Sequence, residues 1–104
     1  MKKFLEFIEK IKANFQDPEN VKEKNYSLLK KAIDAYTNNS GKIIKEFIKQ
    51  DEFLIIVWKY EDKYFVSNIN KFFVEFDKYK FNDKNTAVFL FKDLTAFSEE
   101  LSEI

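Results

Sequence analysis

The first third of the chain carries apolar residues at helical spacing. Between residues 3 and 15 they recur every three or four positions, which predicts an amphipathic helix. The set is Phe4, Phe7, Ile8, Ile11 and Phe15. Asp17, Pro18 and Glu19 then have the order of an N-cap, a proline in the first turn and a favourable acid. A second helix is therefore expected to begin there and to continue to about residue 37.

Residues 38–41 (Asn-Asn-Ser-Gly) form the clearest loop, because Gly41 is the only glycine of the chain. The segment that follows, residues 42–49, allows two interpretations. Its apolar positions fit a short helix capped by Ser40, and they also fit a strand. Their spacing slightly favours the helix.

The pattern changes after residue 52. Residues 53–60 are almost continuously apolar, β-branched or aromatic, which predicts a central strand. A short polar turn follows, and residues 64–69 read as the second arm of a hairpin. Residues 72–81 alternate in part and favour a strand, although a helix capped by Asn70 also fits their aromatic spacing.

The last quarter of the chain begins with a polar turn at residues 82–85. The pattern then predicts a strand over residues 86–91 and a final helix capped by Asp93. That helix would carry one apolar stripe, formed by Leu94, Phe97, Leu101 and Ile104. The elements together predict one α+β domain over residues 1–104, with two or three N-terminal helices, an antiparallel meander of three or four strands and a C-terminal helix. One helical layer is expected to cover one sheet.

The amino-acid composition argues against most kinds of catalytic and metal-binding site. All 18 basic residues are Lys, and the 104-residue chain has no Arg, His or Cys. Without His the serines lack their usual activating base, and without His or Cys no zinc, copper or iron site is expected. One glycine cannot build a phosphate loop. We therefore predict no catalytic, cofactor-binding or metal-binding residue, and a protein that is not an enzyme.

The composition also indicates the cellular compartment and the base composition of the gene. The absence of cysteine suits a reducing cytoplasm, and no apolar run approaches the length of a membrane span. Lys, Asn, Ile, Phe and Tyr make up 55 of the 104 residues. Their A/T-rich codons indicate a low-GC gene, and we expect a cytoplasmic protein.

Charge gives the remaining signal. The 18 Lys balance 18 Asp and Glu, and this zero net charge argues against a bulk nucleic-acid binder. Lys and aromatic residues lie together in residues 63–66 and 71–76, but Glu75 and Asp77 would repel phosphate, so core packing is the better account. After Lys92 the chain holds only acids among its charged side chains: Asp93, Glu99, Glu100 and Glu103.

The small size, the missing chemistry and the acidic end form a profile that resembles the small immunity proteins of bacterial contact-dependent and polymorphic toxin systems. The resemblance rests on no motif and assigns no residue. It implies a single-domain cytoplasmic inhibitor that binds a cognate toxin, often a basic nuclease. Two alternatives remain: a phage-encoded inhibitor of a host defence protein, and a small nucleic-acid-binding domain.

On that hypothesis we predict which residues bind the partner. Acidic side chains would mimic substrate phosphates, and one aromatic residue would anchor the interface. The predicted acids are Glu99, Glu100 and Glu103 near the end of the chain, with Glu61 and Asp62 in the hairpin turn. The candidate anchors are Trp58, Tyr60 and Tyr64.

Overall fold

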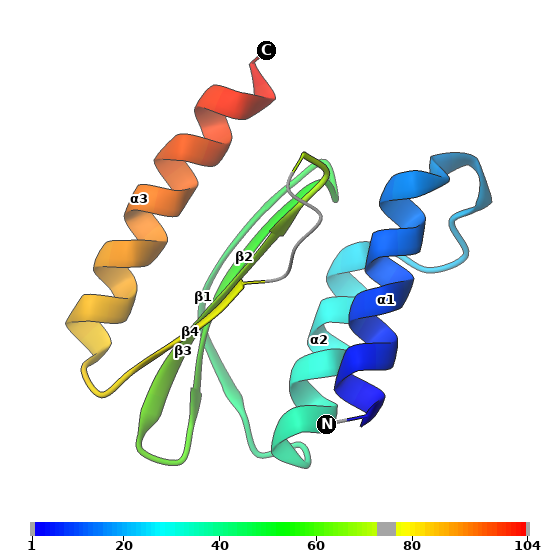
Figure 1. The fold of residues 1–104 in the computed structure, drawn as a ribbon. Coiled ribbons are helices and arrows are strands. Elements are labelled where there is room, and N and C mark those ends of the chain that lie inside the picture. Colours follow the sequence, from blue (N-terminus) through cyan, green and yellow to red (C-terminus); the bar gives the residue numbers. More distant parts are fainter. Residues whose placement is uncertain (1, 73–76, 104) are drawn as a thin grey trace.

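The computed structural model describes residues 2–72 and 77–103 and confirms the α+β class. Two helices precede a four-stranded meander, and a long helix follows it (Figure 1). The elements are α1 (Lys2–Gln16), a 3-10 turn η1 (Pro18–Asn20), α2 (Asn25–Thr37), β1 (Lys42–Lys49), β2 (Phe53–Tyr60), β3 (Lys63–Asn70), β4 (Asp77–Phe81) and α3 (Lys84–Ser102).

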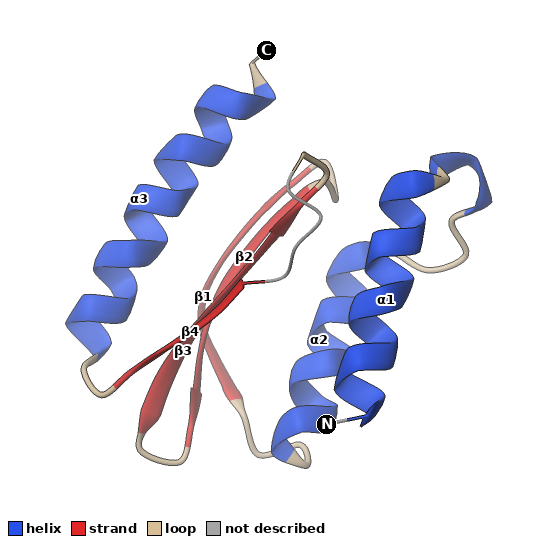
Figure 2. Ribbon diagram, in the orientation of Figure 1, coloured by secondary structure: helices blue, strands red, loops and turns tan. Residues whose placement is uncertain are grey.

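The sheet is covered on both faces, so the prediction of a single helical layer was wrong. Its antiparallel strands follow the order β1-β2-β3-β4. Helices α1 and α2 lie on one face and α3 on the other (Figure 2). The cause lies in β2, where Ile56 packs with α1 and α2 while Ile55 and Val57 pack on the α3 side. A strand that is apolar on both faces needs cover on both.

The larger core lies between the sheet and the pair α1/α2. Trp58 is its largest buried side chain, and its indole stacks on the Phe65 ring with centroids 4.3 Å apart. The indole Nε1–H donates a 2.9 Å hydrogen bond to the Ser67 hydroxyl, which satisfies the polar atom that burial would otherwise leave unpaired. Tyr36 of α2 meets the edge of the same indole at 5.7 Å.

Helix α2 begins at Asn25, seven residues later than predicted. Asp17 caps no helix with its side chain, and it accepts a hydrogen bond from the Asn20 amide instead. The proline after Asp17 starts only the three-residue turn η1. The cap of α2 comes from a distant part of the chain, the turn between β1 and β2.

Asp51 supplies that cap. Its carboxylate oxygens accept the backbone N–H groups of Asn25 at 2.7 Å and Tyr26 at 2.9 Å. The Asn25 side chain donates to the Asp51 carbonyl, and it accepts from the Asn14 amide of α1 at 2.8 Å. Gln50 and Asp51 both adopt positive φ angles of 56°, which turns the chain back within three residues. One short turn therefore links α1, α2 and the sheet.

Residues 42–49 form strand β1, so the preference for a helix was wrong. Ile43 and Ile48 pack with α1 and α2, while Ile44 and Phe47 pack on the α3 side. A bulge between Ile43 and Lys45 sets this two-sided pattern, which imitates helical spacing in the sequence. Pairing with β2 decides the outcome, because the local sequence fits both structures.

Residues 72–81 and the last helix also depart from expectation. A strand is confirmed at β4 (Asp77–Phe81), whereas 73–76 lie outside the described residues. The predicted strand over 86–91 is wrong, because α3 already begins at Lys84. Asp83, not Asp93, caps this helix by accepting the Thr86 N–H at 3.1 Å and the Thr86 hydroxyl at 3.0 Å.

Helix α3 is the least buried of the three helices. Only Ala87 and Ser98 of its residues are buried. Where it meets the sheet, the Thr95 hydroxyl and the Asn68 side-chain oxygen Oδ1 are buried without a hydrogen-bond partner among the described residues. Such orphaned groups cost free energy. The α3 layer is therefore held more weakly than the α1/α2 layer.

The Asp51 cap predicts a specific stability loss. Asp51→Gly removes both carboxylate bonds yet tolerates the positive φ, and it should lower the free energy of unfolding by about 1–2 kcal/mol. Gln50→Gly is the matched control, because it shares the turn and the φ angle but caps nothing. Urea unfolding followed by Trp58 fluorescence measures both; equal losses would contradict the assignment of the cap.

The weak seam of α3 predicts uneven hydrogen exchange. Backbone amides of α3 should exchange faster than those of α1 and α2, because fewer buried contacts oppose local opening. Mass-spectrometric exchange on the native protein measures the difference. Equal protection in all three helices would show that α3 opens only when the whole molecule unfolds.

Candidate functional site

The outer face of α3 carries the most exposed large apolar side chain of the described residues, Phe89, at 69%. One helix 19 residues long turns Ala87, Leu90 and Leu94 toward the sheet and leaves Phe89 on the opposite face. Phe97 is also exposed, at 48%. Burying an exposed phenyl ring against a partner is a large favourable term.

Four carboxylates lie on the C-terminal half of the same helix, from Asp93 at its middle to Glu103 just after its last residue. We call this group the acidic end of α3; it consists of Asp93, Glu99, Glu100 and Glu103. All four are exposed, and none forms an ion pair with another described residue. Negative charge near a helix C-terminus is unfavourable against the helix dipole, and no basic residue occupies the last turn to offset it. Glu99, Glu100 and Glu103 therefore destabilise the end of their own helix, and a basic partner would relieve that cost.

The structure separates the two predicted acidic groups. Glu61 and Asp62 are exposed in the β2–β3 turn, at the end of the sheet where α3 begins, because Tyr64 pairs there with Phe81. The acidic end lies at the other end of α3 (Figure 1). Helix α3 spans about 27 Å, from its residue count and the rise per residue. Glu61 and Asp62 thus do not share one surface with the acidic end.

The structure places the three predicted aromatic anchors in different environments. Trp58 is 0% exposed, so its assignment as a surface anchor was wrong; the ring is a core residue. Tyr60 is half-buried against Tyr36, with ring centroids 6.0 Å apart, on the α1/α2 side. Loss of hydration and the nearby Glu61 raise the pKa of Tyr60 above its usual value. Tyr64 lies on the opposite face of the sheet, with the Lys59 ammonium 5.6 Å from its ring centroid.

Sequence reasoning missed Phe89 because it divided residues 84–102 into a strand and a helix. A signal was present. Asp83 followed by Thr86 is a cap pattern, and apolar residues then recur at helical spacing from Ala87 to Leu94. A helix that begins after Asp83 has more apolar residues than its sheet-facing side can bury. One of them, Phe89, therefore lies on the outer face.

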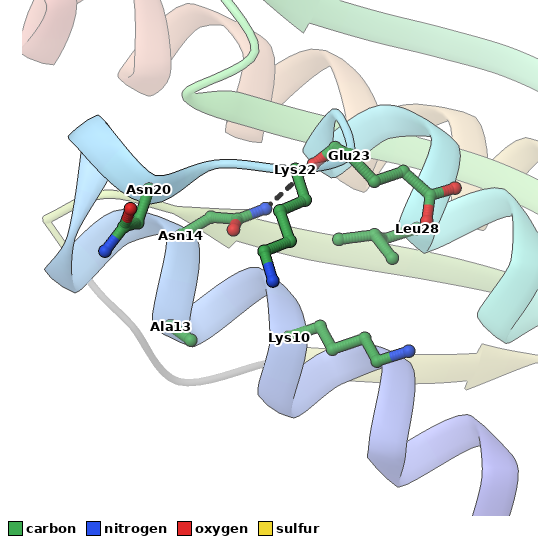
Figure 3. Close-up of a pocket in the computed structure, with 7 residues that line it drawn as sticks. All are labelled: Lys10, Ala13, Asn14, Asn20, Lys22, Glu23 and Leu28. Atoms are coloured by element: carbon green, nitrogen blue, oxygen red, sulfur yellow. Dashed lines mark hydrogen bonds between the residues drawn. The ribbon is translucent and has the colours of Figure 1, made fainter.

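A cavity of about 250 Å³ opens between α1 and the segment before α2 (Figure 3). Its lining is Lys10, Ala13, Asn14, Asn20, Lys22, Glu23 and Leu28. The Asn14 amide donates to the Glu23 carbonyl at 2.9 Å, and the Glu23 carboxylate contacts Lys31 Nζ at 2.6 Å. Lys31 and the Ser27 hydroxyl lower the pKa of Glu23. These polar groups hold the segment in place, so we assign the cavity to the packing of this segment.

Within residues 2–72 and 77–103, no group of three or more acidic side chains is placed to hold a metal ion. No helix in the same ranges is long and apolar enough to cross a bilayer.

Comparisons with protein-family models, with curated proteins and with solved structures each found no match to this chain.

Proposed function

We propose that the chain acts by binding a protein, as an immunity protein that neutralises a cognate bacterial toxin and performs no chemistry of its own. The outer face of α3 is the binding surface. The observation that carries the proposal is Phe89, 69% exposed on a helix whose C-terminal half carries four carboxylates with no ion pair to a described residue.

Each part of this face has a distinct physical task. Phe89 supplies the apolar area that a partner desolvates, as aromatic anchors do in other interfaces. The acidic end of α3 attracts a basic surface and orients it during encounter. A nuclease toxin that binds phosphate offers such a surface, and the carboxylates would occupy the positions of substrate phosphates. An inhibitor of a host defence protein would use the same face, so the partner's identity separates the two functions.

The experiment is a binding titration against the product of the neighbouring gene. Phe89→Ser should weaken binding about tenfold or more, the effect expected for an interface hot spot. Glu100→Lys should weaken it mainly through slower association, and raising the salt concentration should weaken the wild type in the same way.

Matched controls lie on α1, on the far side of the sheet. Leu5→Ser removes a similarly exposed apolar side chain, and Glu6→Lys reverses a similarly exposed acid. Both should leave binding unchanged. If these α1 variants abolish binding while Phe89→Ser and Glu100→Lys bind normally, the binding surface lies on α1 and the assignment to α3 is wrong.

A further inference from the structure

The sheet carries a row of lysines on its α3 side, near the edge formed by β1. We call it the lysine row; it consists of Lys42, Lys45 and Lys49 of β1 and Lys59 of β2. The pairing register places these residues on the face that also holds Phe47, Ile55 and Val57. The other residues that β1 and β2 turn to this face are apolar, so the row holds no carboxylate.

One contact within the lysine row is repulsive. Lys42 lies directly opposite Lys59 in the ladder, and like charges in that position destabilise a sheet. None of the four lysines forms an ion pair with a described residue. The Lys49 ammonium donates to the Ser102 hydroxyl at 2.7 Å, and Lys59 lies over the Tyr64 ring. The row therefore presents four positive charges with no counter-charge.

The complementary charge is present on the same chain. The acidic end of α3 holds four carboxylates that are also unpaired, and the net charge of the whole chain is zero. The two groups match in length. Asp93 to Glu103 covers about 15 Å of helix, and Lys42 to Lys49 covers about 20 Å of strand.

Within one copy the acidic end reaches only the Lys49 end of the lysine row. Lys49 contacts Ser102 at the C-terminal end of α3, whereas Lys59 shares its row with Tyr64 and Phe81, just before α3 begins. The like-charged pair Lys42–Lys59 thus lies at the N-terminal end of α3. The acidic end lies at the opposite end of the helix and cannot neutralise that pair.

We propose that a second copy of this chain supplies the missing counter-charge. Two copies pair about a twofold axis with their α3 helices antiparallel. This arrangement sets the acidic end of each α3 against Lys42, Lys45 and Lys59 of the other copy. The same contact then forms twice, as closed symmetry requires. There is room for it beside β1, because the backbone of α3 lies closest to β2, β3 and β4, and β1 is an edge strand on which Lys42 and Lys45 are exposed.

Charge complementarity favours a second copy over a nucleic acid. Single-strand binders stack bases on exposed rings, whereas Phe47 and Tyr64 beside the lysine row are half-buried in the α3 layer. A second copy needs no exposed ring. It also brings the acids and Phe89 of α3 to the interface.

The dimer goes beyond the proposed function but uses carboxylates that this function assigns to a toxin, so toxin and second copy should compete. Its test needs no toxin. A failure here therefore leaves the proposed function intact, and a failure to bind toxin leaves the dimer intact.

Sedimentation velocity of the full chain tests the dimer. At about 0.01 M salt charges act over roughly 30 Å, and a concentration-dependent dimer should form; at about 1 M salt screening shortens this to roughly 3 Å and should give monomer. The double variant Lys42→Glu, Lys45→Glu should be monomeric at low salt, and so should Glu100→Lys, Glu103→Lys. An equal mixture of the two variants should restore the dimer, because both contacts regain opposite charges.

Two controls guard against loss of folding and against a general charge effect. Lys42→Glu faces Lys59 with an opposite charge, so the thermal midpoint should hold or rise. Lys22→Glu, Lys24→Glu changes the net charge equally on the segment before α2, and it should still dimerise. A wild type that stays monomeric at low salt, a mixture that stays monomeric, or a lysine row that binds single-stranded oligonucleotide while the chain stays monomeric would each overturn the proposal.

Discussion

The carboxylate of Asp51 is the contact on which the arrangement of the layers depends. It accepts the first two N–H groups of α2 from a turn that belongs to the sheet. The residue before α2, Lys24, offers no side-chain cap, so α2 depends on this distant carboxylate to satisfy its first turn. Asn25 and Asn14 extend the contact to α1. The helical pair is thereby fixed on one face of the sheet, which positions the aromatic core around Trp58.

The face of the sheet that α3 covers is held by weaker contacts. No comparable polar network holds α3 among the described residues; it rests on a smaller apolar cluster and on the Lys49–Ser102 hydrogen bond. Its seam includes orphaned polar atoms, its outer face exposes Phe89, and its last turn gathers carboxylates against the helix dipole. These features are costs within an isolated chain, and the last two become favourable when a basic, partly apolar surface covers the helix. This asymmetry between the two layers is the physical basis of the functional proposals.

The sequence predicts correctly those elements whose apolar pattern fits only a helix or only a strand. The helix over residues 3–15 and the hairpin of β2 and β3 follow from local periodicity and are confirmed. Residues 42–49 and 86–91 were misassigned because short apolar runs fit two periods, and pairing with β2 or a cap at Asp83 decides between them. The Asp51 cap lies 26 residues from Asn25, so no local signal reveals it. At the candidate site the acidic residues were visible in the sequence, whereas the exposure of Phe89 and the burial of Trp58 depended on which face each element buries.

The central claim is that α3 is the helix that binds a partner. Hydrogen exchange of the chain, measured with and without its bound toxin, tests this claim most directly, because it reports every helix in one experiment. The account predicts that amides of α3 become strongly protected in the complex while those of α1 stay unchanged. Protection confined to α1 and α2, with α3 exchanging as in the free chain, would contradict it.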